Sequence, residues 1–163
     1  DYSMKNRTYR YMEDEPLYPF GYGLSYTKFA YSDLALSREE LAADDDEPVR
    51  VSVKVKNVGD VAGDEVVQLY VKDLEASVTI PKWELRGFKR VHLKPSETVE
   101  VEFELTRRHL SIIDNDGRRL VEPGAFRIYV GGQQPDDRSR ELTGQDVLRT
   151  ELTVTGEVVE LEY

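Results

Sequence analysis

Apolar and polar side chains alternate without a break in Val49-Arg50-Val51-Ser52-Val53-Lys54-Val55-Lys56. Successive side chains of a β-strand point to opposite faces, so this stretch has one apolar face and one mostly charged face. A strand of this kind covers a hydrophobic core with one side and meets water with the other. The stretch therefore predicts a half-buried β-strand.

The same period recurs further along the chain. It is found in 67–71, 88–93, 99–105 and 126–130, and in a last strand marked by Leu152, Val154 and Val158. Turn signals separate these segments at Asn57-Val58-Gly59-Asp60, Lys94-Pro95-Ser96, Asn115-Asp116-Gly117, Glu122-Pro123-Gly124 and Gly131-Gly132. About seven short strands predict an all-β, two-sheet sandwich of immunoglobulin or fibronectin III type. Uneven spacing and aromatics gathered at one end make a lipocalin-like barrel the less favoured alternative.

Two short helical segments are expected beside the strands. Ser37-Arg38-Glu39-Glu40-Leu41 has the spacing of a capping box and predicts one turn of helix. Asp44-Asp45-Asp46-Glu47 then predicts a solvated loop, so that 38–48 is an acidic insertion. A second helical turn is expected near 106–113, before a hairpin.

The first 26 residues have a different character. Glu15-Pro16-Leu17-Tyr18-Pro19-Phe20-Gly21-Tyr22-Gly23-Leu24-Ser25-Tyr26 holds two prolines, two glycines, one phenylalanine and three tyrosines. Proline stiffens the backbone and the aromatic rings favour burial. We expect an extended strap, residues 1–26, that lies across another surface, followed by the sandwich in 27–163. Because the sequence begins at Asp1 without an initiator Met, we expect it to be a piece of a longer polypeptide.

Composition limits the function. The 163 residues carry a formal charge of −10, which argues against a nucleic-acid partner because phosphate binding needs a basic face. No apolar run has membrane-spanning length and no signal peptide is visible, while the compartment is left open. Cysteine is absent, which excludes disulfides and thiolate chemistry in this chain.

Catalytic and metal sites find little support in the sequence. His92 should point outward from a strand and His109 should lie in a connection, so neither predicts a Ser-His-Asp site. Asp114-Asn115-Asp116-Gly117 resembles the start of a calcium loop, but a hairpin turn is the better interpretation because the remaining ligands do not follow. The carboxylates fall almost entirely on polar strand faces or in loops, which argues against an acid/base pair. We therefore predict no catalytic, metal or cofactor residue.

Trp83 is the only tryptophan, in Ile80-Pro81-Lys82-Trp83-Glu84-Leu85-Arg86-Gly87-Phe88. Gly87 in this strand predicts a bulge or a close backbone approach. Two interpretations of the segment stay open. It is either a contact loop that faces a partner domain, or a segment in which Trp83 or Phe88 caps the core of the sandwich.

Several motifs resemble glycoside hydrolase family 3, which contains β-glucosidases and β-xylosidases. Arg7-Thr8-Tyr9-Arg10-Tyr11 and the segment 16–29 resemble the junction that leads into the C-terminal domain of that family. The resemblance continues through the motifs at 55–60, 63–71, 84–91 and 122–126 and covers about Arg7 to Gly132. The acidic insertion and the tail after Gln133 fit the family less distinctively.

This resemblance implies a fibronectin III-like accessory domain that braces the catalytic domains of a β-glycosidase. In the family the nucleophile and the acid/base residue belong to the preceding domains, and neither motif occurs here. The implied partner is the catalytic part, in the same polypeptide or as a separate chain. The candidate docking residues are Tyr9, Tyr11, Tyr18, Phe20, Tyr22, Tyr26 and Trp83.

Two other functions remain open. A carbohydrate-binding module would present a row of exposed aromatic side chains, for which Tyr70, Trp83 and Tyr129 are the candidates. A protein-interaction module would use the strap to bind an unrelated protein.

Overall fold

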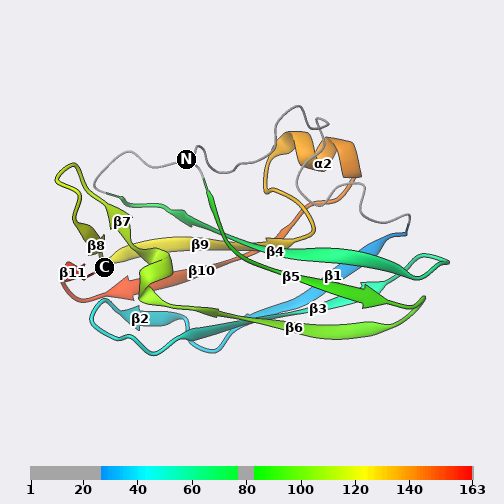
Figure 1. Ribbon diagram of the computed structural model, residues 1–163, viewed down its shortest axis with the longest axis horizontal. Helices are drawn as coiled ribbons and strands as arrows, with labels where there is room; N and C mark the ends of the chain where they lie inside the picture. The colour runs from blue at the N-terminus through cyan, green and yellow to red at the C-terminus, as the bar shows by residue number, and fades with distance from the viewer. Residues whose placement is uncertain (1–26, 77–82, 163) are drawn as a thin grey trace.

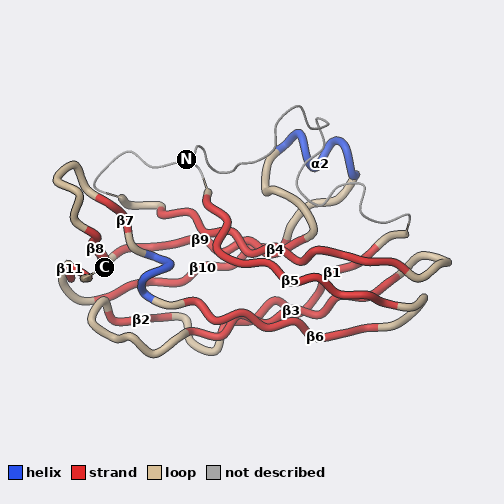
Figure 2. The backbone as a smooth tube through the Cα atoms, viewed as in Figure 1, coloured by secondary structure: helices blue, strands red, loops and turns tan. Residues whose placement is uncertain are grey.

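The computed structural model describes residues 27–76 and 83–162. It confirms an all-β sandwich, in which two sheets lie face to face (Figures 1 and 2). The first sheet has the order β1-β3-β6, with β1 Phe29–Leu36, β3 Val49–Asn57 and β6 Thr98–Leu105. The second has the order β2-β10-β9-β4-β5, with β2 Glu40–Ala42, β10 Leu148–Thr155, β9 Gly124–Gly131, β4 Gly63–Asp73 and β5 Glu84–Leu93.

A third, small sheet closes one end of the sandwich. Its order is β11-β8-β7, with β11 Val159–Leu161, β8 Arg119–Val121 and β7 Ile112–Ile113. A 3₁₀ helix, η1, spans Arg107–Leu110, so the helical turn expected near 106–113 is confirmed. The helix α2, Asp137–Thr143, lies on the side of the second sheet that faces away from β3 and β6 (Figure 1).

The hydrophobic core lies between the two large sheets. The four valines of β3 are at most 1% exposed, as their alternation predicts. The apolar side chains that share this core with β3 include Val67, Leu69 and Val71 of β4, Phe103 and Leu105 of β6, and Phe126, Ile128 and Val130 of β9. Burial of these side chains at about 25 cal/mol per Å² is the main force that holds the sheets together.

The Asn57 corner, defined here as Asn57, Gly59 and Thr27, joins the two sheets to the start of the sandwich. Asn57 is fully buried, and its side-chain amide donates to the carbonyls of Val61 and Leu93 at 2.9 and 3.0 Å. Its side-chain oxygen accepts from the Thr27 hydroxyl at 3.0 Å and from the Gly59 N–H at 2.9 Å. A Cβ on Gly59 would lie 1.6 Å from Thr27 Oγ1, so only glycine fits there.

Several local predictions are wrong. Ser37–Leu41 does not form a helical turn, because 40–42 is β2, paired parallel with β10 at 153–155. Leu41 is 1% exposed in this pairing, and that burial outweighs a helical cap. The predicted last strand is two strands, β10 and β11, with Val158 exposed between them.

The Gly131-Gly132 pair is also not a simple turn, because Gly131 is the last residue of β9. Added Cβ atoms would lie 2.6 Å from Val147 Cγ1 at Gly131 and 2.2 Å from Glu65 Oε2 at Gly132. Close packing on Val147 therefore requires glycine at 131, whereas a side chain at 132 would displace the Glu65 carboxylate. Gly87 is a confirmed case of the same kind, since the β4–β5 register shifts beside it and its Cβ would lie 3.2 Å from the Phe103 ring.

Candidate functional site

The outer faces of the two sheets differ in chemistry. On the first sheet, exposed charged residues of opposite sign face each other across β3 and β6, as Arg50 does with Glu104 and Lys54 with Glu100. Such a face is stable in water and needs no cover. We call it the charged face.

The outer face of the second sheet is apolar only in part, because Asp64 pairs with Arg90 and His92 on it, and Arg127 pairs with Glu151. Val66, Gln68 and Tyr70 of β4 point away from the core, yet they are 5%, 0% and 4% exposed. The Tyr70 hydroxyl donates to Gln68 Oε1 at 2.6 Å, so both polar groups are satisfied. β4 is therefore buried on both sides, which the alternation in 67–71 did not predict.

An aromatic cluster covers part of this surface. Tyr70 of β4 lies opposite Tyr129 of β9, and Val147 packs on both, with partly buried Trp83 beside them. Trp83 therefore packs outside the sandwich, on the second sheet, and does not cap the main core. Phe88 does not cap the core either, because it is 60% exposed on the same strand face as Leu85, which is 38% exposed. We call the surface around Trp83, Leu85 and Phe88 the apolar face.

Six of the seven candidate docking residues, Tyr9, Tyr11, Tyr18, Phe20, Tyr22 and Tyr26, lie outside the described residues. Trp83 is the one that the structure places, and it belongs to the apolar face. The two other aromatics proposed for a carbohydrate-binding row, Tyr70 and Tyr129, are buried at 4% and 6% exposure. They do not form an exposed platform with Trp83.

The prediction that carboxylates fall almost entirely on polar faces or in loops has two exceptions, one at each end of β4. Glu65 and Asp73 have the phase of Val67, Leu69 and Val71, so they point inward at opposite ends of an apolar run. The Tyr31 hydroxyl donates to Glu65 Oε2 at 2.8 Å. Burial raises the pKa of Glu65 from 4.5 to about 7, although the bond from Tyr31 opposes the shift. Burial and the Glu65 charge raise the pKa of Tyr31 well above 10.

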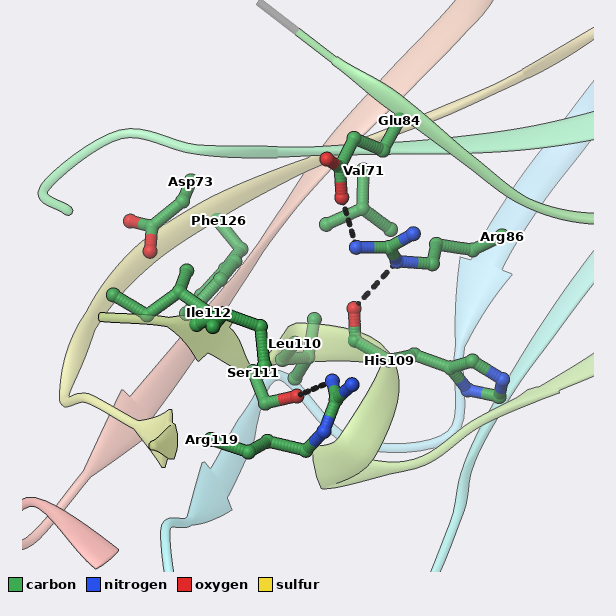
Figure 3. A pocket seen from close by; sticks show the side chains of 11 residues that line it. Val71, Asp73, Glu84, Arg86, His109, Leu110, Ser111, Ile112, Arg119 and Phe126 are labelled. Carbon is green, nitrogen blue, oxygen red and sulfur yellow. Dashed lines mark hydrogen bonds and ion pairs between the residues drawn. The ribbon is translucent and has the colours of Figure 1, made fainter. Parts of the chain in front are cut away.

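A pocket of about 400 Å³ opens at the Asp73 end (Figure 3). Its apolar lining comes from Val71, Leu110, Ile112, Ile113 and Phe126, and its polar lining from Asp73, Glu84, Arg86, His109, Ser111 and Arg119. Arg86 forms an ion pair with Glu84 and donates from Nε to the His109 carbonyl at 2.8 Å. Arg119 donates to the Ser111 hydroxyl at 2.9 Å. Burial, together with nearby Glu122 and Glu75, raises the pKa of Asp73.

Neither histidine is arranged for nucleophilic catalysis. His109 Nδ1 accepts from the Thr106 N–H at 2.9 Å and caps η1, and burial and Arg86 lower its pKa. His92 is exposed on β5, as predicted, and its Nδ1 lies 2.5 Å from Asp64 Oδ1. Nδ1 of each ring is therefore already engaged, that of His109 by the Thr106 N–H and that of His92 by Asp64.

The Asp114-Asn115-Asp116-Gly117 segment is a turn, as expected. Asp114 Oδ1 accepts from the N–H groups of Asp116 and Arg118, both at 2.9 Å, and Gly117 has a φ of 80°. The Arg118 side chain donates to Asp114 Oδ2. In the described ranges no three His, Asp or Glu residues are grouped as a metal site, and none of the helices there is long and apolar enough to cross a membrane.

Comparison with known proteins adds to this geometry. The model of the fibronectin type III-like domain matches residues 65–134. A putative β-xylosidase of Formosa agariphila is 42% identical over 139 residues, and thermostable β-glucosidase B of Acetivibrio thermocellus is 43% identical over 150. These alignments cover 83% and 90% of this chain but 18% and 19% of the relatives.

Solved structures agree with the sequence relatives. A Listeria innocua β-glucosidase in complex with glucose matches with a TM-score of 0.72 and 36% identity, over 93% of this chain and 19% of that one. A Thermotoga neapolitana β-glucosidase in complex with α-D-glucose matches with a TM-score of 0.72 and 34% identity, over 91% and 19%. The chain thus spans about a fifth of the length of the relatives that it matches.

Proposed function

This chain carries a fibronectin type III-like domain of the kind found in family 3 β-glucosidases and β-xylosidases, and on that premise we propose that it is the non-catalytic accessory part of such a β-glycosidase. It braces the catalytic part, which belongs to the same polypeptide or to a separate chain. The parent enzyme hydrolyses terminal β-linked sugars, and only its catalytic part acts on them.

One observation carries the proposal: the two outer faces of the sandwich are unequal. The charged face is built for water, whereas the apolar face exposes Phe88, Leu85 and part of Trp83 above an already buried strand. Aromatic anchors near the centre of a contact supply most of the binding energy in protein interfaces. This difference supports the apolar face as the surface that docks on the catalytic part.

The bracing role predicts a specific loss in the parent polypeptide. We expect Phe88→Asp to place a charge in the contact and to speed thermal inactivation of glycosidase activity about tenfold, equivalent to about 1.4 kcal/mol. The measurement is residual hydrolysis of a nitrophenyl β-glucoside and a nitrophenyl β-xyloside after heating.

Thr98→Asp is the matched control, because Thr98 is an exposed strand residue beside Glu100 on the charged face. It should leave the inactivation rate unchanged. Equal rates for the two variants would contradict docking through Phe88. Hydrolysis of either nitrophenyl glycoside by the pure 163-residue chain would contradict the accessory role itself.

The aromatic-row type of carbohydrate-binding module is less favoured. Its candidate rings Tyr70 and Tyr129 pack under Val147 and Trp83 and cannot stack on a polysaccharide without unpacking this cluster. The protein-interaction alternative keeps the same apolar face but exchanges the partner, and co-purification with a protein other than a glycosidase would favour it.

A further inference from the structure

The pocket at the Asp73 end is a separate feature from the apolar face. Its lining comes from the end of β4, the start of β5 and the η1–β7 segment, with Arg119 of β8 and Phe126 of β9 (Figure 3). Its volume of about 400 Å³ lies in the usual range for small-molecule sites, which is roughly 300–1,000 Å³. Apolar side chains form one part of the lining and polar groups converge from several elements, which is the usual composition of a ligand site.

The two ends of β4 show why Asp73 stands out. Glu65 and Asp73 are both inward carboxylates, but Glu65 receives the Tyr31 hydroxyl. Asp73 receives only the backbone N–H of Glu75 at 2.9 Å, and no side chain in 27–76 or 83–162 donates to it. A half-buried carboxylate needs hydrogen-bond donors, so Asp73 has acceptor capacity that a ligand could fill.

The charges around the pocket limit the ligand. Two carboxylates, Asp73 and Glu84, face two guanidinium groups, Arg86 and Arg119, and Glu75 and Glu122 lie near Asp73 outside the lining. A bound anion would therefore be repelled at the Asp73 end of the pocket, and a bound cation would be repelled by the two guanidinium groups. A purely apolar ligand would strip water from Asp73 without supplying a donor. Vicinal hydroxyl groups, which both donate and accept, satisfy carboxylates and guanidinium groups together.

We propose that this pocket binds a neutral polyhydroxylated ligand of the size of one pyranose unit. The hydroxyls donate to Asp73 and Glu84 and accept from Arg86, and the C–H edge of the ring packs on Val71 and Ile112. The pocket and the apolar face share strand β5, in which Glu84 and Arg86 line the pocket and Leu85 between them belongs to the apolar face.

The test is a titration of the ¹⁵N-labelled 163-residue chain with methyl β-D-glucoside and methyl β-D-xyloside, followed by amide and arginine Nε–H shifts. We expect saturable shifts at Asp73, Arg86 and Ser111 with a Kd of about 1 mM, which corresponds to about −4 kcal/mol. Asp73→Asn keeps the oxygen that accepts from Glu75 but loses the charge. It should weaken binding about tenfold, because hydrogen bonds to charged groups are stronger than neutral ones.

Asp60→Asn is the matched control, since Asp60 is an exposed carboxylate in the β3–β4 turn, next to the other end of β4. It should bind the glycosides like the wild type. If Asp73→Asn does not fold, Glu84→Gln tests the second acceptor with the same expected direction. No shift at the pocket up to about 100 mM glycoside, a hundredfold above the expected Kd, would overturn the proposal. Glycoside-induced shifts only outside the pocket, or equal affinity of Asp73→Asn and Asp60→Asn for the glycosides, would also overturn it. The same holds if acetyl-lysine amide, a charged probe, gives saturable shifts at the pocket and the glycosides do not.

Discussion

Replacing Asn57 by alanine is expected to lower the free energy of unfolding by about 3–5 kcal/mol. The fully buried Asn57 side chain makes four hydrogen bonds in this corner. Alanine leaves the Val61 and Leu93 carbonyls and the Gly59 N–H without these partners. An unpaired buried group costs about 1–3 kcal/mol, and this cost falls mainly on the Leu93 carbonyl, whose bond to Asn57 is buried, because Val61 and Gly59 lie in a partly exposed turn.

The measurement is urea unfolding of the 163-residue chain, with a fall in Tm of about 10 °C as the calorimetric counterpart. Asn115→Ala is the matched control, because Asn115 is exposed in the 114–117 turn. It should change stability by less than about 0.5 kcal/mol. Asn57→Asp should be at least as damaging as Asn57→Ala, since a carboxylate oxygen would then face two carbonyls. Equal stability of the Asn57 and Asn115 variants would show that the corner is not a structural anchor.

The strands could be predicted because one face of each meets the core. The valines of β3 and the apolar residues of β6 and β9 alternate with charged or polar side chains, and this period needs no knowledge of the partner strand. The turns at Asn57-Val58-Gly59 and at 114–117 could be predicted because Asn, Asp and Gly favour turn conformations. The two-sheet sandwich was thus accessible from local pattern alone.

β2 could not be predicted from the same reasoning. It is three residues long, and its parallel partner β10 is more than a hundred positions away in the sequence. A capping-box spacing in 37–41 gave a local helical signal, but burial of Leu41 and Ala43 under the sheet decides the structure. A non-local contact of this kind leaves no short-range period in the sequence.

The candidate site shows a second limit. The inward phase of Glu65 and Asp73 could have been found by extending the alternation of Val67, Leu69 and Val71 in both directions. The partner of Glu65, however, comes from β1, and the pocket beside Asp73 needs η1 and β7. Phase is a property of one strand, whereas a hydrogen bond between sheets and a pocket depend on the assembled sandwich.

The free energy of unfolding near neutral pH should depend on Glu65, the inward carboxylate at the start of β4. Its pKa of about 7 in the folded chain lies above its ordinary value of 4.5. Between these two values the folded chain binds more protons than the unfolded chain, so the free energy of unfolding falls as the pH rises. The loss from this group is complete above about pH 7 and amounts to about 3 kcal/mol.

The carboxyls of Asp45, Asp64 and Asp114 have lowered pKa values, so their stabilising effects are lost only below about pH 4.

Glu65→Gln removes this titration while keeping a polar group beside Tyr31. The variant should match the wild type near pH 4.5 and exceed its stability by about 2–3 kcal/mol at pH 8, as measured by urea unfolding across that range. Glu102→Gln, an exposed strand position on the charged face, should leave the wild-type pH profile unchanged.

Tyr31→Phe gives an independent check. Loss of the hydroxyl that stabilises the ionised carboxylate should raise the pKa of Glu65 further, and the ¹³C shift of its carboxyl carbon follows this titration. A Glu65 midpoint near 4.5, or parallel pH profiles for Glu65→Gln and the wild type, would mean that water reaches this carboxylate and that the inter-sheet pair carries no electrostatic penalty.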